Sequence, residues 1–162
     1  MRVSIENNYR KVQRAAEDSD MEKTTDLVIG SSLGSELSNE EAGVLAELMS
    51  YRDIVDGEFL IEEGATDDTL HVLLSGKIEV VKHTGAGETA SLAILRPGAL
   101  AGEMSFVDGA VHTVGLRALT DCRVLALRRK DFEEIIEQHP LIVYKVMRAV
   151  TRSAHRIVHQ MN

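Results

Sequence analysis

Residues 59–64 read FLIEEG and residues 69–80 read TLHVLLSGKIEV. In each stretch an apolar or β-branched run leads to a glycine, where a tight turn demands a positive φ. The pattern continues in both directions, because turn dipeptides recur about every ten residues between Tyr51 and Leu127. No gap between the runs is long enough for the crossover helix of a parallel sheet, so an all-β sandwich or barrel is indicated. Six segments are predicted to be strands: 59–61, 70–74, 77–82, 89–95, 113–119 and 123–127.

Helical patterns flank this β region. Ser38-Asn39-Glu40-Glu41 is a Ser-x-x-Glu capping box, and the apolar face behind it predicts a helix over 39–50. Residues 130–137 predict a short helix, and Pro140 is a suitable first residue for a second one over 140–160. On a helical wheel this last helix has two stripes on opposite sides. The apolar stripe holds Val143, Val146, Met147, Val150, Ala154, Ile157, Val158 and Met161, and the basic stripe holds Lys145, Arg148, Arg152 and Arg156.

The N-terminal segment differs from the rest in being polar and only loosely periodic. Its apolar residues line at most a weak helix, and they are Val3, Ile5, Tyr9, Val12 and Ala16. We therefore expect residues 1–26 to be a polar lead-in, mobile or dependent on a partner. Residues 27–162 are expected to form the folded domain.

Composition limits the class of protein. The chain has 162 residues, of which 44% are hydrophobic and 27% charged, as in an ordinary globular protein. No apolar run approaches the roughly 18 residues of a membrane span, and the N-terminus lacks the core of a signal peptide. The single cysteine, Cys122, excludes an internal disulfide and fits a reducing compartment. We expect a soluble, cytoplasmic protein.

Charge argues against a general nucleic-acid-binding protein. The net charge is −8, and residues 141–162 carry a local +4 with no acidic side chain. The remaining 140 residues therefore carry 14 basic and 26 acidic side chains, a net −12. Neutralising phosphates needs a basic face, which this acidic body lacks. The basic stripe of the last helix is expected to be either a solvated face or a surface for a nucleic acid or another anionic partner.

Five stretches of the sequence together resemble the cyclic nucleotide-binding domain, the family of the catabolite activator protein, the regulatory subunit of cyclic-AMP-dependent kinase and gated channels. They are Phe59–Gly64, Thr69–Val80, Leu95–Gly98, Gly102–Phe106 and Arg123–Leu127. The resemblance covers about residues 33–158. It implies a mainly β fold with flanking helices: a small antiparallel β-barrel of the jelly-roll or double-stranded β-helix type, with one N-terminal helix and two C-terminal helices.

The resemblance also implies a ligand site. Gly102-Glu103 matches the start of the family's phosphate-binding cassette, in which the glutamate accepts a hydrogen bond from the ribose 2′-hydroxyl and backbone N–H groups hold the cyclic phosphate. The expected ligand-binding residues are Ala101, Gly102, Glu103, Met104, Ser105, His112 and Thr113. The ligand would be cyclic AMP or another cyclic nucleotide, and no further cofactor is expected.

Two positions depart from the family pattern. His112 stands nine residues after Glu103, where the family has a phosphate-binding arginine, and Ala101 replaces the usual aromatic residue. Loss of a charge-assisted hydrogen bond of roughly 1.5–3 kcal/mol weakens binding about ten- to hundredfold. Three alternatives stay open: a working site with His112 and Thr113 on the phosphate, a site retuned for another anion or nucleotide, and a vestigial pocket. Arg117 is expected to face the other side of its strand, so it does not replace the missing arginine.

Other chemistries are not expected. The sequence has no His-x-His pair of the kind found in cupin metal enzymes. His155 and His159 have a metal-capable spacing but no acidic or Cys partner nearby, and are expected to be solvated. Cys122 has no neighbouring histidine, so it is expected to be a structural thiol. We therefore expect no metal site and no enzymatic activity.

The last helix suggests how such a domain signals. In the family this helix dimerises or covers the nucleotide base, and an apolar stripe of this length is not expected to pack entirely on a small barrel. We expect a homodimer through residues 141–160. The sequence stops after this helix, so we expect no helix-turn-helix domain for DNA. The expected function is a stand-alone regulatory module in which ligand at 101–113 shifts the 129–137 helix and acts on an unidentified protein partner. The alternative is a ligand-free dimeric scaffold.

Overall fold

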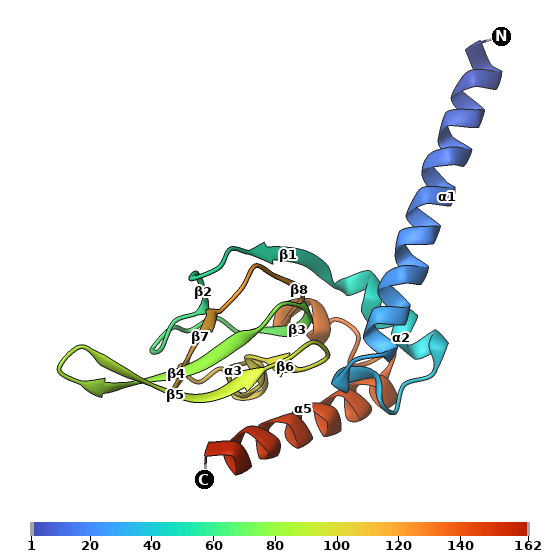
Figure 1. The fold of residues 1–162 in the computed structure, drawn as a ribbon. Helices are drawn as coiled ribbons and strands as arrows, with labels where there is room; N and C mark the ends of the chain where they lie inside the picture. Colours follow the sequence, from blue (N-terminus) through green and yellow to red (C-terminus); the bar gives the residue numbers. More distant parts are fainter. Residues whose placement is uncertain (1, 162) are drawn as a thin grey trace.

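The computed structural model describes residues 2–161, with side chains left out of the description at 2–4, 9, 12–19, 158, 160 and 161. The elements follow one another along the chain as drawn in Figure 1. The helices are α1 (Arg2–Ile29), the short 3-10 turn η1 (Ser32–Gly34), α2 (Asn39–Leu48), α3 (Glu103–Asp108), α4 (Arg129–Glu133) and α5 (Pro140–Met161). The strands are β1 (Ser50–Ile54), β2 (Phe59–Ile61), β3 (Thr69–Ser75), β4 (Ile78–Gly85), β5 (Glu88–Leu95), β6 (Leu100–Ala101), β7 (Gly115–Ala118) and β8 (Cys122–Arg128).

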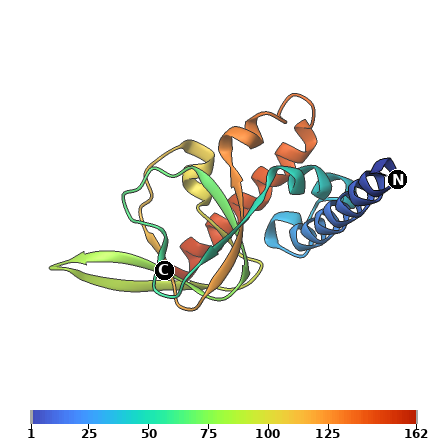
Figure 2. The same ribbon diagram turned by 90° about the horizontal axis from the view of Figure 1, so that it is seen from above.

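The strands form two four-stranded antiparallel sheets, in the orders β1-β8-β3-β6 and β2-β7-β4-β5. This arrangement is a jelly roll, which confirms the predicted fold class. The six predicted strands correspond to β2, β3, β4, β5, β7 and β8, whereas β1 and β6 were not predicted. The β4–β5 hairpin extends beyond the sheets as an arm, which Figure 2 shows from above.

Strand β3 of the sheet β1-β8-β3-β6 is buried on both faces. Alternate residues of β3 point to opposite sides, so Leu70 and Val72 pack against the helices while Leu73 faces the space between the sheets. Each side has its own apolar cluster. The helix side includes Leu45, Phe106, Phe132 and Val146, and the inner side includes Ile61, Ile78, Val80 and Val124. This sheet therefore separates the apolar core on the helix side from the apolar core between the two sheets.

The caps that begin and end the helices follow the sequence signals in part. Ser38 and Glu41 form the predicted capping box: the Glu41 N–H donates to Ser38 Oγ at 3.2 Å, and the Ser38 N–H donates to Glu41 Oε1 at 3.0 Å. Helix α4 ends at Glu133, so the helix predicted over 130–137 is shorter than expected. The residues after it form turns.

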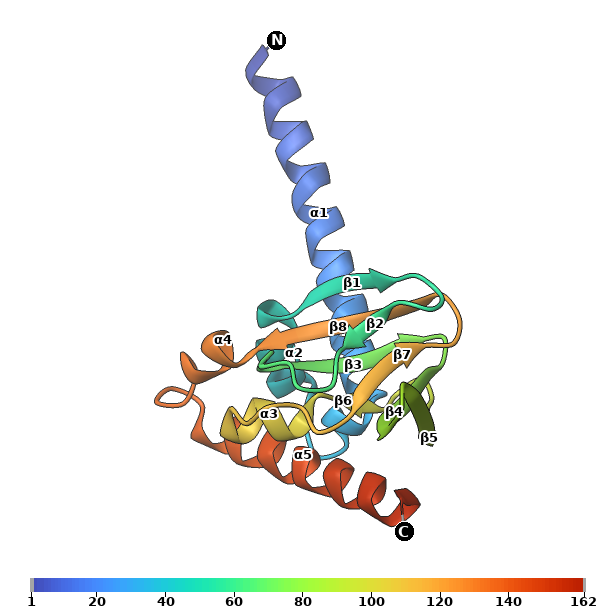
Figure 3. The ribbon, with the colours of Figure 1, turned by 90° about the vertical axis from the view of Figure 1, so that its left-hand side faces the viewer.

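Helix α1 runs through the boundary predicted between residues 26 and 27. Among the described side chains of α1, those of Thr24 and Val28, in its last turns, are buried against the domain. The Thr24 Oγ1 and Tyr51 hydroxyl oxygens lie 2.8 Å apart and join α1 to β1. The rest of the helix projects away from the domain, as Figures 1 and 3 show.

Helix α5 packs its apolar stripe on its own domain, contrary to the expectation that the stripe was too long to do so. Val146 and Val150 are buried, Val143 and Met147 are half-buried beside them, and Ile157 reaches the core between the sheets. Val158 and Met161 lie outside the described side chains. Among residues 2–161, no helix is both long and apolar enough to cross a membrane.

The basic stripe of α5 is bound to acidic side chains of the same chain. Lys145 Nζ lies 2.7 Å from Glu41 Oε1, and Arg148 and Arg152 lie 3.3 Å and 2.9 Å from Glu36 Oε1. Hydrogen bonding to these cations lowers the pKa of both glutamates. Three of the four basic residues therefore bind α5 to the segment that contains α2, while Arg148 and Arg152 also remain exposed to solvent.

The turn at Gly76 generates a stability prediction. Gly76 has φ +90°, and a Cβ there would lie 2.6 Å from Cys122 Sγ and 2.8 Å from Thr120 Oγ1. Gly57 has a similar φ of +87° with nothing within 4 Å of the added carbon. We expect Gly57→Ala to lower the free energy of unfolding by about 1–2 kcal/mol, the cost of the left-handed conformation, and Gly76→Ala to lower it clearly more. Urea denaturation measures both, and equal losses would show that crowding at Gly76 is relieved without cost.

Candidate functional site

The predicted site lies where β6 gives way to α3. Gly102 makes this connection with φ +82°, and a Cβ there would lie 2.7 Å from the carbonyl oxygen of Thr69 and 3.1 Å from Ile61 Cδ1. Only glycine satisfies both the positive φ and the close approach of these atoms. The glycine therefore has a structural role in holding the start of α3 against β3.

A cavity of about 60 Å³ lies beside this turn. Six of the seven predicted ligand-binding residues line it: Ala101, Gly102, Glu103, Met104, His112 and Thr113. The exception is Ser105, whose hydroxyl donates to the carbonyl oxygen of Ala110. Val80, Leu95, Val114, Leu116 and Ile157 complete the wall. Pockets for small molecules measure roughly 300–1,000 Å³, so the cavity is far smaller than a nucleotide needs.

Glu103 is the most unusual group in the site. Only 5% of it is exposed, and Ser153 Oγ of α5 donates a hydrogen bond of 2.6 Å to Glu103 Oε1. Burial raises the pKa of the Glu103 carboxyl, and the Ser153 hydrogen bond opposes this increase without cancelling it. The carboxylate predicted to bind a ribose hydroxyl is thus bound by a hydroxyl of the protein itself.

His112 is engaged by the protein at both ring nitrogens. Its Nε2 lies 2.6 Å from the carbonyl oxygen of Asp67, which only accepts, so Nε2 carries a hydrogen. Its Nδ1 lies 3.3 Å from Ser105 Oγ. Its backbone N–H donates to the carbonyl oxygen of Ala65, and its carbonyl oxygen accepts from the Gly64 N–H. The residue therefore fastens the loop after α3 to the β2–β3 loop, and it must exchange a partner to reach a phosphate.

Lys82 is a cation at the site that the sequence analysis missed. Its Nζ donates to the carbonyl oxygen of Thr113 at 2.7 Å and to Glu63 Oε1 at 2.6 Å. The hydrogen bond from Lys82 lowers the pKa of the Glu63 carboxyl. Alternation along β4 from Val80, which lines the cavity, was the signal that could have placed Lys82 on this side. Arg117 faces away as predicted and bonds to Glu79 at 2.7 Å.

His71 is a second group that sequence reasoning did not assign. It is fully buried in β3 beside Gly102, and its Nδ1 has no hydrogen-bond partner among the described residues. Burial lowers the pKa of His71 to about 4, so the ring is neutral near pH 7. Cys122 is buried, in keeping with a structural thiol. The described part of the chain contains no group of three His, Cys, Asp or Glu side chains suited to a metal ion.

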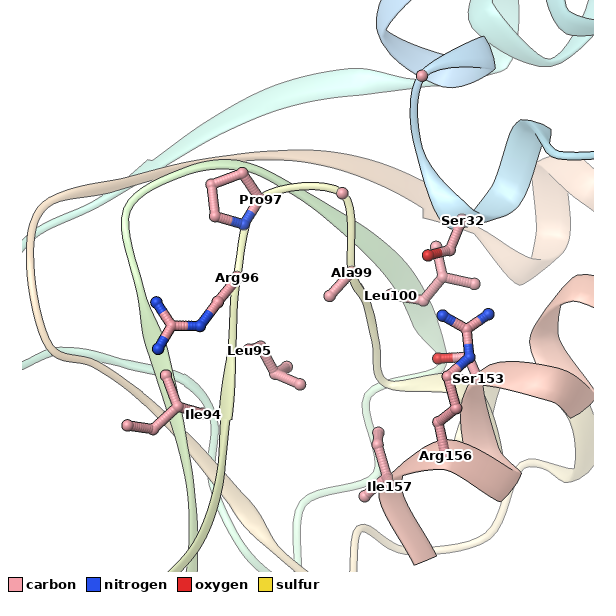
Figure 4. A pocket seen from close by; sticks show the side chains of 12 residues that line it. Ser32, Ile94, Leu95, Arg96, Pro97, Ala99, Leu100, Ser153, Arg156 and Ile157 are labelled. Atoms are coloured by element: carbon pink, nitrogen blue, oxygen red, sulfur yellow. The ribbon is translucent and has the colours of Figure 1, made fainter. Parts of the chain in front are cut away.

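Helix α5 closes the site from outside. Ile157 lines the small cavity and also the larger cavity next to it, of about 420 Å³, which Figure 4 shows between the 94–100 segment and α5. In that view Ser153 and Arg156 of α5 face Ser32 across the larger cavity. Leu95 and Ile157 belong to the walls of both cavities. Withdrawal of Ile157 would therefore enlarge the site toward a volume suited to a nucleotide.

Comparison of the sequence with known proteins agrees with a cyclic nucleotide-binding fold. The model of the family described as "Cyclic nucleotide-binding domain" matches residues 51–139. The chain is 29% identical over 123 residues to a cyclic AMP receptor protein of Thermus thermophilus, covering 76% of this chain and 57% of that protein. It is 30% identical over 107 residues to patatin-like phospholipase domain-containing protein 6 of Pongo abelii, covering 65% of this chain but 8% of that protein. The chain therefore spans about half or less of the length of these relatives.

A solved structure supports the fold. A cyclic nucleotide-binding domain from Methylobacillus flagellatus KT superposes with a TM-score of 0.76 at 24% identity, covering 88% of this chain and 81% of that one. The superposition covers more of the chain than the family match does.

The raised pKa of Glu103 predicts a specific dependence of stability on pH. Between the ordinary carboxyl value of 4.5 and the raised value, the folded state binds more protons than the unfolded state, so this group's contribution to stability falls as pH rises. Glu103→Gln removes that loss while keeping an oxygen that accepts from Ser153. We expect the stability of the variant relative to the parent to increase between pH 4.5 and pH 8 in thermal denaturation.

Glu41→Gln serves as the control, because the Lys145 hydrogen bond lowers the pKa of Glu41. That variant is expected to lose stability relative to the parent only as pH rises from the lowered pKa to about 4.5, and to run parallel to the parent between pH 4.5 and pH 8. Parallel stability curves for Glu103→Gln and the parent would contradict the account of a buried, destabilised carboxylate.

Proposed function

Because this chain belongs to the cyclic nucleotide-binding domain family, we propose that it is a regulatory module in which a cyclic nucleotide competes with helix α5 for one site. A single observation carries this proposal: the Ser153 hydroxyl of α5 occupies Glu103, the carboxylate expected to receive a ribose hydroxyl. In this proposal a ribose hydroxyl replaces the Ser153 hydroxyl at this buried carboxylate. Occupancy of the site is therefore linked to the position of α5, and through it to contacts with another protein.

The closed state, with α5 on the site, and the nucleotide-bound state differ in specific contacts. A nucleotide at Glu103 replaces the Ser153 hydrogen bond and displaces Ile157 from the wall of the cavity. Movement of α5 also strains its ion pairs to Glu36 and Glu41. The ligand must supply this free energy through its differential affinity for the open state, and the closed helix lowers its apparent affinity accordingly.

Lys82 provides the positive charge that position 112 lacks in this proposal. A cyclic phosphate would receive backbone N–H groups at the start of α3, which have no acceptor within the helix. Lys82 already donates to the backbone of Thr113, a residue of the cavity wall, so a small movement from Glu63 brings it to an anion. His112 in contrast supports the cassette through its bonds to Asp67 and Ser105.

A dimer through residues 141–160 is the second part of the proposal. Although the apolar stripe of α5 is covered, Leu141 and Tyr144 are each 57% exposed. The Arg148 guanidinium lies 5.7 Å from the centre of the Tyr144 ring. These side chains form an outward patch on which α5 of a second copy would pack. The module is proposed to work without catalysis, in the cytoplasm.

The rival is a ligand-free scaffold with a vestigial pocket. The observation that favours it is the cavity of about 60 Å³, together with Ala101 and His112 at positions where the family has other residues. A site retuned for another nucleotide or anion is the remaining alternative. The titrations below separate these functions.

We expect calorimetric titration with cyclic AMP to detect binding, and Ser153→Ala to tighten it severalfold because the closed state loses a hydrogen bond of about 1 kcal/mol. Lys82→Met should weaken binding about tenfold or more, since a charge-assisted contact is lost. Lys77→Met, an exposed lysine of the adjacent turn, is the matched control and should bind as the parent does. Absence of saturation at millimolar ligand in the parent and in Ile157→Ala would favour the scaffold.

The same titration at pH 6 and pH 8 tests the assignment of the cation. An imidazole changes its charge across this range, so binding through His112 would weaken at the higher pH. We expect nearly equal affinities, because Lys82 rather than His112 contacts the phosphate. Affinity that falls severalfold by pH 8 would return this contact to His112.

The dimer has its own test. Tyr144→Glu places a charge in the outward patch of α5, away from the cavity, and should lower the molar mass measured by light scattering while leaving nucleotide affinity intact. Leu141→Ala should act in the same direction more weakly. Unchanged mass in both variants would remove α5 as a dimer interface.

A further inference from the structure

The first three quarters of α1 form an exposed shaft, which we define as residues 2–23. At 1.5 Å per residue, the 28 residues of α1 span about 42 Å. Every described side chain of the shaft is exposed, and Ile5 is 62% exposed. Figures 1 and 3 show the shaft leaving the domain in a single direction. An isolated helix of this kind is marginal in water, so a partner is needed to stabilise it.

Charge along α1 is divided into two opposite halves. Residues 2–14 contain four basic residues and one acidic residue, a net +3. Residues 15–26 contain five acidic residues and one basic residue, a net −4. The basic residues are Arg2, Arg10, Lys11 and Arg14 in the first half, and the acidic ones are Glu17, Asp18, Asp20, Glu22 and Asp26 in the second.

This distribution is unfavourable for a helix on its own. The positive half lies at the positive end of the helix dipole, and α1 has no acidic residue in its first turn and no basic residue in its last. Pairs four residues apart do not offset this, because like pairs such as Arg10/Arg14 are matched in number by opposite pairs such as Arg14/Asp18. The dipole effect opposes a lone helix, and it is relieved if an oppositely charged helix lies alongside.

We propose that the shafts of two copies of this chain pair side by side in antiparallel orientation. An antiparallel pair sets each +3 half against the −4 half of the other copy and opposes the two helix dipoles. A parallel pair would set like charges together. The antiparallel contact is self-complementary, so it closes as a two-fold dimer and does not propagate.

The spacing of apolar residues supplies a seam for this pair. Positions 5, 9, 12 and 16 recur at intervals of four, three and four residues and so share one face of α1. Thr24 and Val28, which contact the domain, lie roughly a third of a turn away around the helix. Lys23 continues the same stripe toward the base of the shaft, and of this stripe Ile5 and Lys23, whose side chains are described, are both exposed.

This pairing is independent of the proposed nucleotide function and of the proposed α5 dimer. The shaft contributes residues 2–23 and the proposed α5 patch contributes Leu141 and Tyr144, so the two interfaces share no residue. Self-association is accordingly tested in a Tyr144→Glu background, in which α5 contacts are weakened and the mass that remains reports on α1.

Charge reversal is the first test, by sedimentation equilibrium of the full chain. Arg10→Glu, Lys11→Glu and Arg14→Glu together make both halves acidic, and should raise the dissociation constant more than about tenfold. Adding Glu17→Lys, Asp18→Lys and Glu22→Lys reverses the polarity of the whole helix and should restore pairing. High salt should weaken the parent pair. Association unchanged by the first set, or absent in the parent, would overturn the proposal.

Cysteine cross-linking then tests the orientation, in a Cys122→Ser background. Ile5→Cys and Lys23→Cys are both exposed, share the seam, and would face each other across an antiparallel pair. A mixture of the two single variants should form a disulfide-linked heterodimer on mild oxidation. A cross-link between two copies of Ile5→Cys alone would show parallel pairing and overturn the proposal. Thermal unfolding of each variant checks that the domain remains folded.

Discussion

The carboxylate of Glu103 is buried at the start of α3, and its removal from water carries a free-energy cost that hydrogen bonds must offset. The offset comes from a neutral hydroxyl, Ser153 Oγ, supplied from the far end of the chain. This hydrogen bond at Glu103 Oε1 therefore joins helix α5 to α3 and, through α3, to the β-barrel. A neutral partner leaves the carboxyl pKa raised, whereas a cation would have lowered it.

The position of α5 depends on contacts of two kinds. On one side its cations bind Glu36 and Glu41, and exposed pairs of this type each contribute little in water. On the other side Ile157 inserts toward the core between the sheets, where burial of an apolar side chain contributes more. These two kinds of contact together hold α5 in one position, and the weakness of the ion pairs still allows the helix to move. Displacement at the cavity would be felt first by Ile157 and only afterwards by the ion pairs.

The β framework was predictable because its strands alternate with glycine turns, and the capping box at Ser38 set the start of α2. Strand β1 escaped detection because SYRDI exposes four of its five residues and lacks an apolar rhythm. The cassette residues follow from the Gly102-Glu103 resemblance. Their partners do not, since the bonds from Ser153 and Lys82 join residues far apart in sequence. The apolar stripe of α5 predicted an amphipathic helix, but it did not indicate which surface would cover the stripe.

The pairing of β1 with β8 has a consequence for synthesis on the ribosome. Ile54 lies opposite Cys122, so β1 cannot pair within its sheet until β8 has been synthesised. At about 5–20 residues per second, that delay is roughly 3–14 seconds. During it β1 is an unpaired edge that nascent chains nearby can join. Arg52 and Asp53 stand in the middle of this strand, and charged residues on an edge discourage such pairing. The charged residues that made β1 hard to predict therefore also discourage β1 from pairing with other chains before folding is complete.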